Sequence, residues 1–99
     1  MYKVTVLYKH PPDEQAFEKY YKETHLPLTA KIPHLDHAEF TKFVPGPDGR
    51  KASYYRMAEL YFATSEFMVE GLNSADGLAA ARDIPKFATG GFEFLFGLI

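Results

Sequence analysis

The 99-residue sequence predicts an α+β fold in which four antiparallel strands carry two helices on one face. Two observations lead to this prediction. Segments with alternating apolar residues and segments with helical spacing follow one another in the order βαββαβ, and clusters of turn-forming residues separate them. In addition, 46% of the residues are hydrophobic. The length suits one domain, which we expect to cover residues 1–99.

The first half of this pattern starts with a strand and a helix. Tyr2 to Lys9 alternates as a strand, and the His10-Pro11-Pro12 sequence ends it because proline cannot take part in a strand ladder. Asp13 is then placed to cap a helix. Apolar residues at helical spacing extend that helix from about Glu14 to Leu28.

A hairpin follows the first helix. The segment from Leu35 to Val44 is rich in aromatic and alternating residues, and the sequence Pro-Gly-Pro-Asp-Gly at 45–49 is typical of a turn. Ser53 to Phe62 alternates again and is expected to be the return strand.

The last third predicts the second helix and the last strand. Ser65 is placed to cap the helix, residues 73–77 interrupt it, and helical spacing resumes from Leu78 to Ile84. Gly90-Gly91 then leads into a strand at 92–96.

Four strands and two helices in this order form the ferredoxin-like arrangement, with both helices on one face of the sheet. The alternation puts apolar side chains on both faces: Val4 and Val6 lie opposite Leu7, and Phe94 lies opposite Leu95. Because the helices cover only one face, we expect a second copy of the chain to cover the other in a symmetric homodimer.

Composition excludes several classes of function. The formal net charge of -2 and the pI near 6.0 argue against nucleic-acid binding and against binding to anionic membranes, since both need a basic surface. The sequence has no cysteine, which excludes disulfides, thiolate catalysis, cysteine-ligated zinc and iron–sulfur clusters. The chain starts directly with a strand and has no apolar stretch of membrane-spanning length, so we expect a cytoplasmic protein.

His25 is the most informative residue. It shares the apolar stripe of the first helix with Phe17, Tyr21 and Leu28, so its side chain is expected to face the protein. Pro27 cannot donate a hydrogen bond to the carbonyl of Glu23, and its ring clashes there, so the helix should end or kink within a turn of the imidazole. Two interpretations are open: a catalytic histidine in a pocket, or a core histidine whose nitrogens are both satisfied.

Glu59 is the companion that the sequence suggests for His25. It shares a strand face with Tyr55, Met57 and Tyr61, and an inward carboxylate on that face needs a partner. The alternative is a glutamate at the rim, paired with Arg56 or a lysine of the helix. We therefore predict His25 and Glu59 as catalytic residues.

Tyrosines complete the predicted site. Tyr21, Tyr55 and Tyr61, with Pro27 beside the histidine, are predicted to contact the substrate, and a phenol can donate to an oxyanion. The sequence His34-Leu35-Asp36-His37 places its two imidazoles on opposite faces of a strand, so no metal site is predicted. No nicotinamide or flavin fingerprint is present, and no cofactor is predicted.

Four segments together resemble the EthD family of dimeric α+β-barrel proteins: His25-Leu26-Pro27-Leu28, Ala58 to Phe62, Ser74 to Gly77, and Asp83. The resemblance implies a ferredoxin-like protomer, a barrel formed with a second protomer, and a pocket between helices and sheet. The family takes its name from ethyl tert-butyl ether degradation. The wider superfamily includes lactone isomerases, polyketide cyclases, cofactor-independent monooxygenases and haem enzymes.

Two functions follow from the residues and the resemblance together. The first is a cofactor-independent enzyme in which His25 acts as general acid and base on a small hydrophobic carbonyl, phenol or lactone, in ether or aromatic degradation or a polyketide pathway. The second is a non-catalytic dimer that binds or carries a hydrophobic ligand, or an accessory protein of an oxygenase system. Haem ligation by His25 is a minor alternative, because no arginine cluster for the propionates lies near it.

Overall fold

The computed structural model describes residues 1–99 and confirms the predicted order of elements. The chain has four strands and two helical segments. The first helical segment contains a π-helical turn, and Ser74 divides the second into two helices. The elements are β1 (Tyr2–Tyr8), α1 (Glu14–Tyr20), η1 (Tyr21–His25), α2 (Leu26–Thr29), β2 (His37–Lys42), β3 (Arg56–Phe62), α3 (Ser65–Asn73), α4 (Ala75–Phe87) and β4 (Phe92–Leu98).

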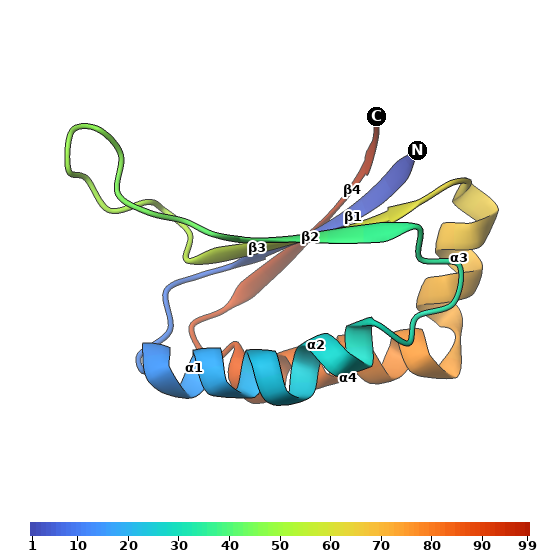
Figure 1. The fold of residues 1–99 in the computed structure, drawn as a ribbon, viewed down its shortest axis with the longest axis horizontal. Helices are drawn as coiled ribbons and strands as arrows, with labels where there is room; N and C mark the ends of the chain where they lie inside the picture. The colour runs from blue at the N-terminus through green and yellow to red at the C-terminus, as the bar shows by residue number, and fades with distance from the viewer.

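The sheet has the order β2-β3-β1-β4, and every neighbouring pair is antiparallel. Figure 1 shows the helices packed below this sheet, with no helix on its other face. Val4 pairs with Leu60 on one side and with Phe96 on the other, so these three side chains point toward the helices. The ferredoxin-like prediction is therefore confirmed.

Side-chain caps start the helices. Asp13 accepts from the Ala16 N–H at the start of α1, as predicted. Thr64 caps α3, where we had expected Ser65, because the threonine has the extended backbone that a cap needs. Ser74 ends α3 and caps α4 by accepting from Gly77, which is the predicted interruption.

The first helix does not end before Pro27. Instead, residues 21–25 form one π-helical turn, in which the Leu26 N–H bonds to the Tyr21 carbonyl, and the helix continues as α2. A π-turn widens the helix just before the residue that lacks an N–H, so the missing hydrogen bond is accommodated without a break. His25 is the last residue of this wide turn.

The uncovered face of the sheet is more polar than the alternation suggested. Thr5, Leu7, Met57 and Leu95 lie on it, but so do the charged side chains of Lys3, Glu39, Glu59 and Glu93. Four of the large exposed apolar residues lie along β4: Phe94, Leu95, Phe96 and Leu98. No helix is long and apolar enough to span a membrane.

Candidate active site

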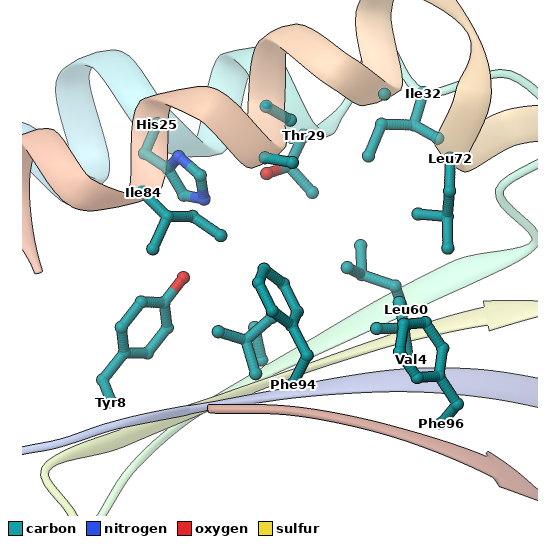
Figure 2. Close-up of a pocket in the computed structure, with 15 residues that line it drawn as sticks. Val4, Tyr8, His25, Thr29, Ile32, Leu60, Leu72, Ile84, Phe94 and Phe96 are labelled. Carbon is teal, nitrogen blue, oxygen red and sulfur yellow. The ribbon is translucent and has the colours of Figure 1, made fainter. Parts of the chain in front are cut away.

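A cavity of about 240 Å³ lies between the sheet and the helices (Figure 2). Apolar side chains from β1, β3, β4, α3 and α4 and from the loop after α2 make most of its wall. The lining residues are Val4, Val6, Tyr8, His25, Thr29, Ile32, Ala58, Leu60, Leu72, Gly77, Ala80, Ala81, Ile84, Phe94 and Phe96. Because Phe94 and Phe96 are also 41% and 64% exposed, the cavity reaches the surface along β4.

His25 contributes a titratable group to this cavity. Its side chain is buried, and its Nδ1 lies 3.0 Å from the Asp83 Oδ2. The ring packs against Phe87, at 4.6 Å between centroids, and stacks on Tyr21. Figure 2 shows the second ring nitrogen directed into the cavity. One nitrogen is therefore held by the protein, and the other is available to a ligand.

Asp83 reaches His25 from the neighbouring helix. Ala80, Asp83, Ile84 and Phe87 recur at helical spacing and form the buried stripe of α4. The two carboxylate oxygens of Asp83 have different partners: Oδ2 faces His25, and Oδ1 accepts from the Tyr20 hydroxyl at 2.6 Å. Both oxygens of this buried carboxylate therefore have a hydrogen-bond partner.

The surroundings of His25 lower its pKa. Burial disfavours the charged imidazolium and outweighs the hydrogen bond and charge of Asp83, which act in the opposite direction. The ring is thus neutral at pH 7. Because a carboxylate can only accept, the proton of the neutral ring is assigned to Nδ1, which donates to Asp83, and the nitrogen in the cavity then has a free lone pair. This is the arrangement of a general base oriented by a carboxylate.

The structure does not place Glu59 beside His25. Glu59 lies on the uncovered face of the sheet and accepts from Lys3 at 2.7 Å and from the Tyr61 hydroxyl at 3.3 Å. Asp83 has the position that we had expected for Glu59. The predicted pairing was wrong because alternation shows which residues share a face of the strand, and it does not show which face the helices cover.

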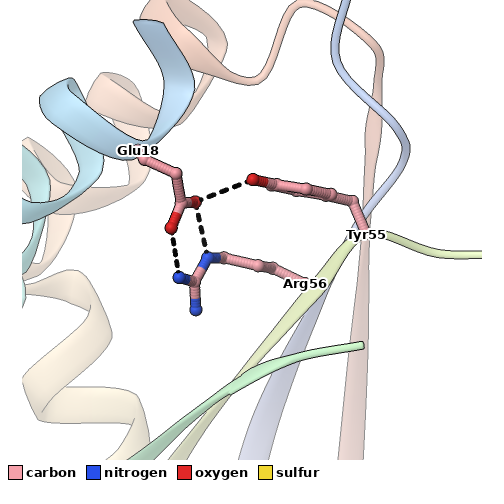
Figure 3. A network of polar contacts seen from close by, with 3 residues as sticks. All are labelled: Glu18, Tyr55 and Arg56. Carbon is pink, nitrogen blue, oxygen red and sulfur yellow. Dashed lines mark hydrogen bonds and ion pairs between the residues drawn. The ribbon is translucent and has the colours of Figure 1, made fainter. Parts of the chain in front are cut away.

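Tyr55 lies in the core and not on the face of Tyr61, because the chain is irregular before β3 begins at Arg56. Its hydroxyl donates to Glu18 on α1, and Glu18 also accepts two hydrogen bonds from the Arg56 guanidinium (Figure 3). This network fixes the start of the first helix to β3. It lies outside the cavity lining.

The other residues predicted to contact the substrate are also absent from the lining. Tyr21 supports His25 by stacking against it, and Pro27 is exposed on the next turn. Tyr61 lies on the uncovered face, where it stacks against His37. Tyr21 therefore contacts the candidate site through His25, and Pro27 lies outside the cavity lining.

Sequence reasoning assigned no site role to three residues: Asp83, which it used only for the family resemblance, Tyr20 and Tyr8. A signal for Asp83 was present, because a carboxylate on an apolar helical stripe is as unusual as a histidine there. Tyr20 and Tyr8 carried no such signal, since tyrosine is common at the edges of cores.

Metal and haem are not favoured by the side chains. No group of three histidine or acidic residues is close enough together to hold a metal ion, and His37 bonds to Asp36 on an exposed edge. The cavity lining has no arginine or lysine that could bind the propionates of haem.

Comparisons with known proteins place this geometry in a family. The model of the EthD domain matches residues 9–91. An uncharacterized 11.0 kDa protein of Rhodococcus erythropolis, from the thcB-thcC intergenic region, is 37% identical over 97% of this chain and 92% of its own length. The crystal structure of an ethyl tert-butyl ether degradation (EthD) family protein of Bacillus halodurans is 35% identical, with a TM-score of 0.94 over 100% of this chain and 98% of that one.

More distant structures share the fold alone. A dimeric protein of unknown function from Bacteroides fragilis is 16% identical, with a TM-score of 0.68 over 99% of this chain and 95% of its own. SnoaB, a cofactor-independent oxygenase from Streptomyces nogalater, is 13% identical, with a TM-score of 0.66 over 99% of this chain and 90% of that one.

Proposed function

This chain belongs to the EthD family, and from the site it carries we propose that it is a small enzyme that moves a proton on or off a hydrophobic carbonyl, phenol or lactone. The step uses the protein's own side chains and no cofactor. The observation that carries the proposal is the neutral, buried imidazole of His25, held on one nitrogen by Asp83 and open to the cavity on the other.

The cavity defines the class of substrate. Twelve of its 15 lining residues are hydrophobic, so the body of the ligand is apolar. An apolar cavity of roughly 150 Å³ holds benzene, so about 240 Å³ suits a molecule of one or two rings. The acidic hydrogen of the ligand has to lie near His25, because the imidazole is the group able to accept it.

His25 is the proposed catalytic base, and Asp83 positions it. When Nε2 takes the proton, the ring becomes an imidazolium, and the adjacent Asp83 carboxylate stabilises the new charge. The apolar wall excludes water and thereby strengthens this interaction. The same ring then returns the proton at another atom of the substrate, which completes an isomerisation or cyclisation.

A second copy of the chain is proposed as the partner. The uncovered sheet face and the exposed β4 residues Phe94 and Phe96 offer apolar area, and the dimeric Bacteroides fragilis protein shows that this fold supports such an assembly. The pathway, whether ether or aromatic degradation or polyketide synthesis, stays a prediction from the family resemblance.

Proton exchange tests the proposal without knowledge of the full reaction. Aryl ketones and lactones are incubated with the protein in D₂O, and nuclear magnetic resonance measures deuterium uptake at the carbon next to the carbonyl. General-base catalysis accelerates this exchange, and His25→Gln should lower the acceleration by about a hundredfold or more. The matched control is His34→Gln, because His34 is an exposed histidine outside the cavity.

The outcome separates enzyme from carrier. If these compounds bind equally well to wild type and His25→Gln and neither protein accelerates exchange, the proposed chemistry is wrong. The non-catalytic ligand carrier is then the better description.

A further inference from the structure

Tyr8 places a second polar group on the cavity. Its ring is fully buried at the end of β1, and its hydroxyl has no hydrogen-bond partner within the protein. Figure 2 shows this hydroxyl rising from the sheet into the cavity, on the wall opposite the helix that carries His25. Buried hydroxyls nearly always have a partner, so this one needs an explanation.

Packing does not explain the hydroxyl. The ring of Tyr8 makes edge contacts with Phe17 and Tyr21, at 5.5 and 5.7 Å between centroids, and a tilted contact with Phe87 at 5.7 Å. A phenylalanine would make the same contacts. The oxygen therefore adds an unsatisfied polar atom to the core, which lowers stability unless a ligand supplies the partner. The buried hydroxyl of Tyr21 also has no partner, but Tyr21 lies outside the cavity lining.

We propose that Tyr8 donates a hydrogen bond to the ligand oxygen that becomes negative when His25 takes the proton. This inference rests on the proposed function and narrows the substrate to a phenol or an enolisable ketone. Such a ligand offers one oxygen or carbonyl group that accepts from Tyr8 and one hydrogen that His25 removes.

The electrons balance for both types of substrate. In a phenol, the O–H bond breaks, a bond forms between Nε2 and hydrogen, and the pair left on oxygen accepts from Tyr8. In a ketone, the C–H bond breaks, its electron pair forms a carbon–carbon double bond, and the carbonyl pair moves to the oxygen. Burial raises the pKa of Tyr8, so its hydroxyl keeps the proton that it has to donate.

The test uses 4-nitrophenol as the probe, because the phenol and the phenolate absorb at different wavelengths. Full-length wild type, Tyr8→Phe and the control Tyr2→Phe are compared. Tyr2 is on the same strand and the same face as Tyr8 and lies outside the cavity lining. Toluene, which has no oxygen, reports whether the cavity of each variant is intact.

Three results are expected for Tyr8→Phe. Its affinity for 4-nitrophenol falls about tenfold and the bound phenolate fraction decreases, since a hydrogen bond to a charged oxygen is lost. Its affinity for toluene is unchanged. Its melting temperature equals or exceeds that of wild type, because an unsatisfied polar atom is removed.

Other results would overturn the inference. Binding of 4-nitrophenol within twofold of wild type would show that Tyr8 makes no such bond. A lower melting temperature for Tyr8→Phe would show that the hydroxyl has a structural role. If wild type does not bind 4-nitrophenol, the assignment to phenols and enols is wrong. Loss of binding in Tyr8→Phe, combined with unchanged proton exchange in His25→Gln, would instead reject the proposed function and leave Tyr8 as a ligand-binding residue.

Discussion

Two acid–base pairs lie on opposite faces of the same sheet, and they behave differently. On the helix side, His25 meets Asp83 at 3.0 Å; on the uncovered side, Lys3 meets Glu59 at 2.7 Å. The shorter contact is the more exposed one, since the Lys3 side chain is 29% exposed and that of His25 is 6%. Distance alone does not identify the reactive pair.

Surroundings decide what each pair can do. The pKa of Lys3 is raised, chiefly by its hydrogen bond to Glu59, so the ammonium stays charged and has no lone pair to accept a proton. The pKa of His25 is lowered by burial, so its imidazole is neutral and keeps a free nitrogen. A carboxylate at hydrogen-bond distance therefore does not by itself make its partner a base: the partner also has to be neutral at pH 7, as the buried imidazole of His25 is and the ammonium of Lys3 is not.

Removing Asp83 should have the largest effect. Asp83→Ala leaves the His25 Nδ1–H and the Tyr20 hydroxyl without an acceptor, and the free energy of unfolding should fall by about 2–3 kcal/mol in urea denaturation. Asp83→Asn keeps the shape and should be more stable than Asp83→Ala. However, its amide donates to Nδ1 and moves the ring proton to Nε2, so proton exchange should still be lost. Wild-type exchange in Asp83→Asn would contradict the account.

The second-largest expected effect is the loss of folding stability at acidic pH that His25 causes. Because the folded-state pKa of His25 lies below its ordinary value of about 6.5, the unfolded chain binds a proton that the folded chain does not. The contribution of His25 to stability is present above about pH 6.5 and is lost as the pH falls through the folded-state pKa. Wild type should therefore lose stability more steeply than His25→Gln between pH 7 and 5.5.

Urea denaturation at a series of pH values in this range measures the two slopes. The other histidines cancel in the comparison, and Glu18, whose pKa is lowered mainly by Arg56, titrates at more acidic pH. Parallel curves for the two proteins would show that burial does not depress the pKa of His25.

Tyr20→Phe should have a smaller effect on the same pair. The Tyr20 hydroxyl donates to Asp83 Oδ1 at 2.6 Å. When this hydrogen bond is removed, the Asp83 carboxylate loses one of its two donors and attracts the imidazolium of His25 more strongly. The pKa of His25 should therefore rise in the variant, as followed by nuclear magnetic resonance titration of the imidazole. A pKa of His25 that stays the same or falls would mean that Tyr20 does not moderate the carboxylate.

Glu59→Gln should have the smallest effect on chemistry. Its side chain is separated from the cavity by the sheet, so proton exchange should stay within twofold of wild type. A large loss in Glu59→Gln would restore the role that the sequence suggested for this residue.

The sequence predicts the fold well because the fold depends on periodicity, and both strands and helices repeat regularly here. It also predicts the inward direction of His25. It does not predict the partner, because Glu59 and Asp83 were both carboxylates among apolar residues and only the packing of α4 against η1 selects between them. The unpartnered hydroxyl of Tyr8 depends on where the cavity lies, which no local pattern encodes.

The most direct test of the central claim is the protonation state of the His25 ring nitrogens at pH 7, measured by ¹⁵N nuclear magnetic resonance. The account predicts a neutral ring with its proton on Nδ1, toward Asp83, and an unprotonated Nε2. A proton on Nε2, either in the other neutral form or in an imidazolium, would contradict it, because the nitrogen in the cavity would then have no lone pair to act as a base.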